Sequence, residues 1–251
     1  MEFDTQKISS SDARLRNLQK EDYMLYGRQM LLSEIGPEKQ LRLANARVMV
    51  IGAGGLGCPV LQYLNGTGVG HLSCADFDHI EMHNLHRQLL YAPHQVGRAK
   101  VVVAKEVLSR QRPGVHLAFV EEKLTPDNAA RLLCGHDLVI DGSDNFKTRY
   151  LINDTCQALG IPVIYGSISG FEGQLAVFGH KGSKRLRALF PSPPQQGVPN
   201  CAENGVLGTL PGIIGLMMAH EALKLIMELP VLHNELVIFD TLTMRWRKLS
   251  F

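Results

Sequence analysis

The chain has 251 residues, with 45% hydrophobic and 20% charged side chains, as is typical of a soluble globular protein. Its formal net charge of +2 comes from 26 basic and 24 acidic residues, which excludes a broad surface for nucleic acid or an anionic membrane. The five cysteines are widely spaced and form no CxxC pair, so neither a disulfide framework nor a zinc knuckle is indicated. We therefore expect a reducing, cytoplasmic compartment.

The N-terminal residues 1–20 are polar and mixed in charge, which predicts a flexible arm without a signal peptide. Apolar residues then recur at helical spacing from Asp22, the predicted N-cap, to a stop at Gly36. This first helix contains Arg28, and residues 38–46 predict a second short helix.

A glycine-rich loop, GAGGLG, follows an apolar run over 47–51. The run predicts a strand and residues 56–65 predict a helix, an order that places the loop at a helix N-terminus, where phosphate binds. Such a loop alone does not separate an NAD enzyme from an ATP enzyme or from a tight structural turn. Its glycines are Gly52, Gly54, Gly55 and Gly57.

Strands and helices alternate from this loop to residue 165. Apolar strands separated by helices predict a Rossmann-like α/β fold, a doubly wound, mainly parallel sheet covered on both faces. The predicted strands are 71–76, 115–120, 137–141 and 161–165, and the predicted helices are 97–110, 126–134 and 145–159.

The last third of the chain predicts an antiparallel extension of the same sheet. The stretch 206–219 is too short to span a bilayer, so we expect a buried helix there. No linker divides the chain, which predicts a single domain over 21–251. The elements expected are a strand at 173–178, a long crossing over 181–200 without an element, a helix at 211–228 and strands at 236–240 and 244–249.

Charged residues follow the predicted strands at the edge where a doubly wound sheet binds its ligands. Asp76 lies about twenty residues past the glycine loop, the usual place for an acid that binds ribose hydroxyls. A triphosphate attacked at its α-phosphorus needs surrounding cations and a carboxylate for Mg²⁺, which Arg87, Lys100 and Asp144 supply.

Each of these residues also has a structural interpretation. Strand-end aspartates such as Asp76 and Asp144 commonly cap helices, and a lysine on a helix, such as Lys100, is commonly solvated. Arg28 is able to form an ordinary salt bridge. We expect four of the cysteines in the core: Cys58, Cys74, Cys134 and Cys156.

Six motifs occur in a fixed order: RQMLLSEIG, VMVIGAGGLGCP, ADFDHIEMHNLHRQ, VGRAKV, DGSDN and CAENGVLG. Together they resemble the ThiF/MoeB/HesA adenylyltransferases, relatives of the ubiquitin-activating enzymes, over about 22–249. The resemblance implies an enzyme that binds Mg-ATP and a small ubiquitin-like sulfur carrier ending in Gly-Gly. The carrier's terminal carboxylate attacks the α-phosphate, which releases pyrophosphate and leaves an acyl-adenylate.

The resemblance also implies residue roles. Gly55 approaches the nucleotide, Asp76 binds the ribose and Lys100 neutralises triphosphate charge. Asp144, with Asn145, holds the magnesium, and Arg28 reaches in trans into the other subunit of a homodimer. The implied catalysis is electrostatic, because the attacking carboxylate is already ionised at neutral pH. The turn that grips phosphate comprises His83, Asn84, Leu85, His86 and Arg87.

The family's zinc site is missing from this sequence, and the role of Cys201 has two interpretations. Many members bind zinc through two CxxC pairs, whereas Leu186–Leu189 occupies the first location and no second pair precedes Phe251. We expect no zinc, and apolar packing of Trp246, Phe239 and Phe178 in its place. Cys201 matches a cysteine that links covalently to the carrier or to a persulfide donor in some members. A buried structural cysteine is the alternative.

The motifs leave the pathway open. We expect a ThiS-type carrier of thiamine synthesis first and a MoaD-type carrier of molybdenum cofactor synthesis second, with a cysteine desulfurase as a further candidate partner. An NAD-linked oxidoreductase remains an alternative, because Asp76 also suits it, although Arg87, Lys100 and Asp144 have little use there. A catalytically silent scaffold that binds a ubiquitin-like partner is the third interpretation.

Overall fold

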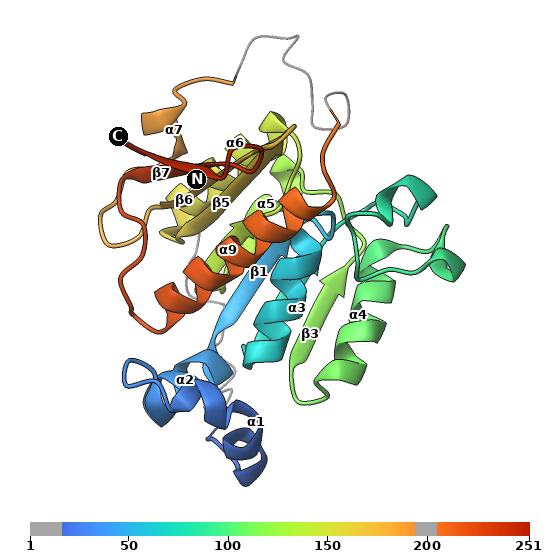
Figure 1. Cartoon of the computed structure of the whole chain (residues 1–251), viewed down its shortest axis with the longest axis vertical. Coiled ribbons are helices and arrows are strands. Elements are labelled where there is room, and N and C mark those ends of the chain that lie inside the picture. The colour runs from blue at the N-terminus through green and yellow to red at the C-terminus, as the bar shows by residue number, and fades with distance from the viewer. Residues whose placement is uncertain (1–16, 194–204) are drawn as a thin grey trace.

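The computed structural model describes residues 17–193 and 205–251 (Figure 1). In this part of the chain eight strands form one sheet, in the order β3-β2-β1-β4-β5-β6-β7-β8. Strands β1 to β5 pair in parallel, and β6, β7 and β8 are antiparallel to their neighbours. The predicted Rossmann-like sheet with an antiparallel extension is confirmed. The strands are β1 (Arg47–Ile51), β2 (His71–Ala75), β3 (His116–Val120), β4 (Leu138–Asp141), β5 (Val163–Ser169), β6 (Glu172–Phe178), β7 (Glu235–Asp240) and β8 (Arg245–Ser250).

Helices cover both faces of the parallel half of this sheet. In β1, Val48 and Val50 belong to one apolar core cluster with residues of α3, α4 and α9, while Met49 and Ile51 join residues of α5 and α6. This explains why the strand is apolar throughout. The helices are α1 (Lys20–Met30), α2 (Gly36–Asn45), α3 (Gly57–Thr67), α4 (Lys100–Gln111), α5 (Pro126–Leu133), α6 (Phe146–Leu159), α7 (Leu186–Leu189) and α9 (Thr209–Ile226), with short 3₁₀ turns η1 (Met82–Asn84) and η2 (Pro93–Gln95).

Helix α9 lies along α3 and the strands β5 and β6, in front of the sheet in Figure 1. By length and composition alone its 18 residues are able to cross a membrane, but half of that stretch is buried inside the molecule, as in a core helix. The helix packs closely on the strands. A Cβ added at Gly166 would lie 2.2 Å from Met218 Sδ, and one added at Gly173 would lie 2.3 Å from the Ile214 side chain. The expected buried helix is therefore confirmed.

The N-terminal boundaries differ from the prediction. Gln19, not Asp22, is the N-cap of α1, and its backbone N–H donates to the Asp22 carboxylate at 2.8 Å. Gly36 begins α2, since Pro37 lacks an N–H and is tolerated in a first turn. Of the predicted arm over 1–20, residues 1–16 lie outside the described part.

The described part of the crossing, residues 181–193, contains an element that the sequence did not predict, the short helix α7. Four residues are too few to show helical periodicity. The apolar packing expected in this lobe is found at Phe178 and Phe239, which are buried, whereas Trp246 stacks on Phe239 at 3.7 Å but stays 51% exposed. The absence of zinc remains a prediction.

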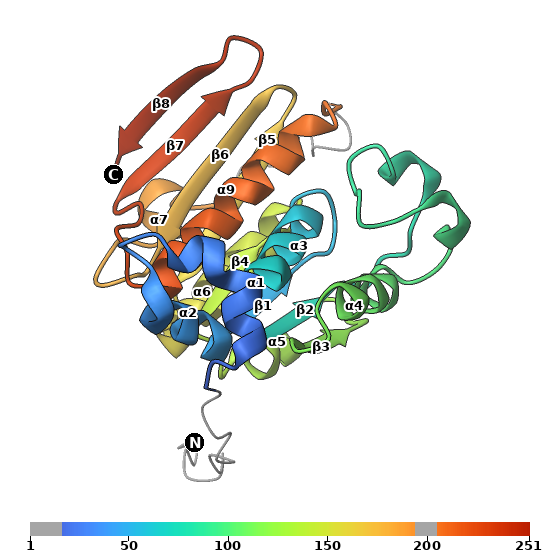
Figure 2. The ribbon, with the colours of Figure 1, turned by 60° about the horizontal axis from the view of Figure 1, so that its bottom comes forward.

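Strand β8 forms one edge of the sheet, beside β7 (Figure 2). All six of its residues are exposed. Three of them are basic: Arg245, Arg247 and Lys248.

Candidate active site

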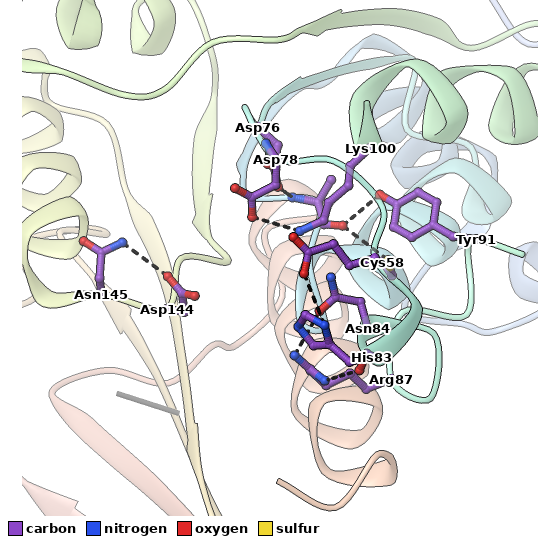
Figure 3. A network of polar contacts seen from close by, with 12 residues as sticks. Cys58, Asp76, Asp78, His83, Asn84, Arg87, Tyr91, Lys100, Asp144 and Asn145 are labelled. Carbon is purple, nitrogen blue, oxygen red and sulfur yellow. Dashed lines mark hydrogen bonds and ion pairs between the residues drawn. The ribbon is translucent and has the colours of Figure 1, made fainter. Parts of the chain in front are cut away.

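A cavity of about 340 Å³ opens at the carboxyl ends of β1, β2 and β4. The chain order reverses here, since β2 lies on one side of β1 and β4 on the other, and ligands bind at such switch points. In Figure 3, Asp144 and Asn145 lie apart from the other labelled side chains. The predicted residues that line the cavity are Gly52, Gly54, Gly55, Asp76, His83, Asn84, Arg87, Lys100, Asp144 and Asn145.

The glycine loop is shaped by close backbone approach. Gly52 has φ +97°, in the left-handed region, and a Cβ there would lie 2.8 Å from the carbonyl oxygen of Gly142. A Cβ on Gly57 would lie 1.9 Å from the carbonyl oxygen of Gly52. Gly57 thus permits the packing of α3 on the strand end, whereas Gly54 and Gly55 line the cavity.

Asp76 braces the glycine loop. Its Oδ2 accepts the Ala53 N–H at 2.6 Å, and its Oδ1 accepts the Asp78 N–H at 2.7 Å. Burial raises the pKa of this carboxyl group, and the nearby charge of Lys100 opposes the shift. Asp76 is therefore not a helix N-cap, although its predicted contact with ribose is untested.

Lys100 begins α4 and is buried, so the solvated-face interpretation is wrong for this residue. Its Nζ lies 2.9 Å from Oδ2 of Asp78, which is half exposed. Arg98, by contrast, is exposed and pairs with Glu106. Lys100 thus brings a positive charge to the cavity wall, where Asp78 is its ion-pair partner.

Arg87 is held within the polar turn that precedes η2. Its Nη1 donates to the carbonyl oxygen of His83 at 3.0 Å, and its Nη2 donates to Oδ1 of Asn84 at 3.1 Å. The His86 ring nitrogen lies 2.7 Å from Nη1. Leu85 packs against the apolar core, and neither Leu85 nor His86 is among the described residues that line the cavity.

Asp144 lies exposed on the opposite wall, in contact with Asn145 Nδ2 at 3.3 Å. Asn145 is the N-cap of α6, since its Oδ1 accepts the Thr148 N–H at 2.9 Å, so Asp144 is not a helix cap. Mg²⁺ is commonly bound by one or two carboxylates together with substrate phosphates and water, and Asp144 fits that requirement. Among the described residues no group of three or more His, Cys, Asp or Glu could hold a metal.

Arg149 was missed by the sequence analysis. It is 4% exposed, and its guanidinium donates to the carbonyl oxygens of Ser143 at 2.9 Å and Gly166 at 3.0 Å. Burial raises the pKa of the neighbouring Asp141, and the Arg149 charge opposes that shift. The only sequence signal was an arginine one helical turn past Asn145.

Arg28 does not line the cavity. It is exposed on α1, which packs on α2 near the amino end of β1, away from the carboxyl-end cavity (Figures 1 and 2). Cys201 lies outside the described residues. Three of the remaining cysteines are buried as expected, but Cys134 is only partly buried.

The fold and the cavity define a nucleotide-binding α/β protein: a glycine loop, strand-end acids and cationic side chains that include Lys100 and Arg87 meet at a topological switch point. Residues 26–251 match the ThiF family. The chain belongs to this family, as its motifs predict. A sulfur carrier protein adenylyltransferase of Thermus thermophilus is 46% identical over 238 residues, which cover 92% of this chain and 88% of that protein.

Longer relatives are also similar. The adenylyltransferase and sulfurtransferase MOCS3 of Culex quinquefasciatus is 44% identical over 90% of this chain, which spans only 52% of that protein. The probable adenylyltransferase/sulfurtransferase MoeZ of Mycobacterium tuberculosis is 41% identical, with 93% of this chain and 61% of MoeZ covered. Adenylyltransferase is the enzyme class that these relatives share.

Two solved structures share the fold. Escherichia coli MccB superposes with a TM-score of 0.79 at 18% identity, over 93% of this chain and 72% of that chain. PaaA superposes with a TM-score of 0.77 at 21% identity, over 96% and 76%. At these identities the likeness concerns the fold alone.

Proposed function

We propose that this chain is an ATP-dependent adenylyltransferase that activates the C-terminal glycine of a small ubiquitin-like sulfur carrier protein. The observation that carries the proposal is one cavity that combines a glycine loop, the buried cation Lys100, Arg87 and the opposing carboxylate Asp144. The name of the 46% identical relative, sulfur carrier protein adenylyltransferase, supports it.

In the proposed reaction a carrier carboxylate oxygen attacks the α-phosphorus of ATP. The bond from that phosphorus to the oxygen bridging to the β-phosphate breaks, and pyrophosphate leaves with its electron pair. Lys100 and Arg87 stabilise the negative charge that develops on the leaving group. Asp144 would hold Mg²⁺, which supplies Lewis-acid neutralisation of phosphate charge. No proton transfer is needed for the attack, because the nucleophile is already ionised at neutral pH.

We propose further that the enzyme works as a homodimer in which Arg28 of one subunit reaches the cavity of the other. The exposure of Arg28 on a helix away from its own cavity supports this arrangement. Such an arginine would add positive charge to a site that already holds Lys100 and Arg87.

The test is ATP–pyrophosphate exchange, measured with purified ThiS-type and MoaD-type carriers that end in Gly-Gly. We expect exchange that depends on one of these carriers and disappears when its terminal glycine is deleted. The carrier that supports exchange identifies the pathway, thiamine or molybdenum cofactor. Exchange with neither carrier, together with tight binding of NAD, would instead support the oxidoreductase alternative.

A further inference from the structure

Tyr91 lies beneath the glycine loop. Its hydroxyl donates to the carbonyl oxygen of Ala53 at 2.8 Å, and its side chain is buried with 6% exposure. The two residues are 38 positions apart in the sequence. The bond therefore ties the loop to a separate segment of the chain.

That segment is the turn that carries Asn84 and Arg87. The Gln88 N–H donates to the Asn84 carbonyl oxygen at 3.0 Å, and the Tyr91 N–H donates to the Gln88 carbonyl oxygen at 3.1 Å. Gln88 is itself buried and lines the cavity beside Gly54. Tyr91 is thus joined through backbone hydrogen bonds to the residues that hold Arg87.

Ala53 is held on both sides of its peptide. Asp76 accepts its N–H at 2.6 Å, and Tyr91 donates to its carbonyl oxygen at 2.8 Å. The Cys58 thiol also approaches the Ala53 oxygen at 3.4 Å, but a thiol is a weak donor.

The phenol stays a donor at all physiological pH values, because burial raises the pKa of Tyr91 further above its usual range. Gly54 and Gly55, which follow Ala53 in the loop and line the cavity, have no side chains that would fix the backbone. A hydrogen bond from a rigid aromatic residue is a direct way to restrict a glycine-rich segment.

We propose that Tyr91 is a positioning residue for ATP, because it fixes the glycine loop to the Arg87 turn before the nucleotide binds. The proposal rests on the proposed function for the identity of the nucleotide. Loss of the hydroxyl leaves the fold in place but frees the Ala53 peptide. ATP must then order the loop when it binds, at a cost in affinity.

The experiment compares Tyr91→Phe with Tyr150→Phe in the full chain. Tyr150 is a matched control, since its hydroxyl also donates to a backbone carbonyl oxygen, that of Phe190, at 2.8 Å. Tyr150 does not line the large cavity in the described part of the chain. ATP affinity is measured by calorimetry without a carrier, alongside KM and kcat for pyrophosphate exchange.

We expect Tyr91→Phe to raise the Kd and KM for ATP about fivefold, the effect of one neutral hydrogen bond, with kcat at saturating ATP within about twofold of wild type. Hydrogen exchange at residues 50–56 rises in this variant. We expect Tyr91→Phe and Tyr150→Phe to lower Tm by similar amounts, because each loses one hydrogen bond to a backbone carbonyl oxygen. Tyr150→Phe leaves ATP affinity and hydrogen exchange at residues 50–56 unchanged.

An unchanged ATP affinity in Tyr91→Phe would overturn the proposal and leave Tyr91 with a role in stability alone. Equal losses of ATP affinity in both variants would also overturn it. Wild-type protein that binds ATP but catalyses no exchange contradicts the adenylyltransferase proposal instead. Even in that case, weaker binding of ATP by Tyr91→Phe than by wild type supports the positioning role of Tyr91.

Discussion

Lys100 and Asp78 form an ion pair of 2.9 Å in which the lysine side chain is 5% exposed and the aspartate 50% exposed. The partner of the buried cation is therefore in contact with water. A phosphate that enters the cavity is able to displace the Asp78 carboxylate from the Lys100 ammonium group. The displacement costs little, because water solvates the half-exposed carboxylate.

Lys100→Met keeps the apolar stem of the side chain and removes its charge. We expect pyrophosphate exchange to fall about 100-fold, because a charge that stabilises the leaving group is lost. Stability falls as well, because the buried Asp76 loses the nearby charge that opposes the rise of its pKa, whereas the half-exposed Asp78 is solvated in the variant. Lys105→Met, at an exposed position on the same helix, is the control. Equal exchange rates for the two variants would contradict the role of Lys100.

Arg149→Met tests the buried arginine behind Asp144. We expect a loss of about 3–5 kcal/mol in the free energy of unfolding, because Asp141 is left without its compensating charge. Guanidinium denaturation measures the loss. Arg187→Met is the matched control, since both guanidinium groups stack on a tyrosine but Arg187 pairs with Asp154 in an exposed bridge. The exposed bridge of Arg187 is worth less than about 1 kcal/mol. Similar losses of unfolding free energy in the two variants would therefore contradict the claim that burial makes the charge of Arg149 important.

His136 makes stability dependent on pH. Its ring nitrogens lie 2.8 Å from the Ser73 hydroxyl and 3.1 Å from the Leu133 carbonyl oxygen. Burial lowers the pKa of His136 below its usual value of 6.5. The unfolded chain therefore takes up the proton first, and stability is lost as pH falls from about 6.5 through the lowered pKa of the folded state, by at most about 1.4 kcal/mol per pH unit.

In His136→Asn we expect a shallower decline of the unfolding free energy between about pH 7 and pH 5. His94→Asn, at an exposed position, keeps the wild-type slope. Urea denaturation at several pH values measures both. A wild-type slope in His136→Asn would show that another group dominates, and the partly buried His71, whose pKa burial also lowers, is the next to test.

The trans role of Arg28 is tested by complementation between two inactive variants, Arg28→Ala and Asp144→Asn. A mixed dimer contains one intact site if Arg28 acts across the interface, because the wild-type Arg28 comes from the partner that carries the Asp144 change. We expect random mixing to restore about a quarter of wild-type exchange. No recovery, with mixed dimers demonstrated by mass spectrometry, would contradict the trans role of Arg28.

The elements of the parallel sheet could be predicted because their signals are local. The apolar run that stops at Gly52 and the apolar run that stops at Asp76 each predict the end of a strand. The strand predicted at 47–51 matches β1. Lys100 shows the limit, since its sequence context is that of a solvated helix, and only the fold of the preceding segment buries it beside Asp78.

The supporting contacts could not be predicted, because they join segments far apart in the chain. Arg149 reaches Gly166 on the neighbouring strand, and Tyr91 reaches Ala53 across 38 residues. Neither residue belongs to a pattern whose spacing reports the contact. A glycine loop between a strand and a helix favours nucleotide binding, but the groups that hold the loop in place are set by tertiary structure.

The exposed edge strand β8 has a consequence for behaviour at high concentration. An unpaired sheet edge is a template for aggregation through strand addition. On β8, Arg247 pairs with Glu172 and Lys248 pairs with Glu235, both in exposed bridges, while Arg245 adds a further positive charge that would face the same charge on a second copy. We expect the charged groups of this strand to disfavour self-association through the edge, with least effect at high salt, where the charges are screened.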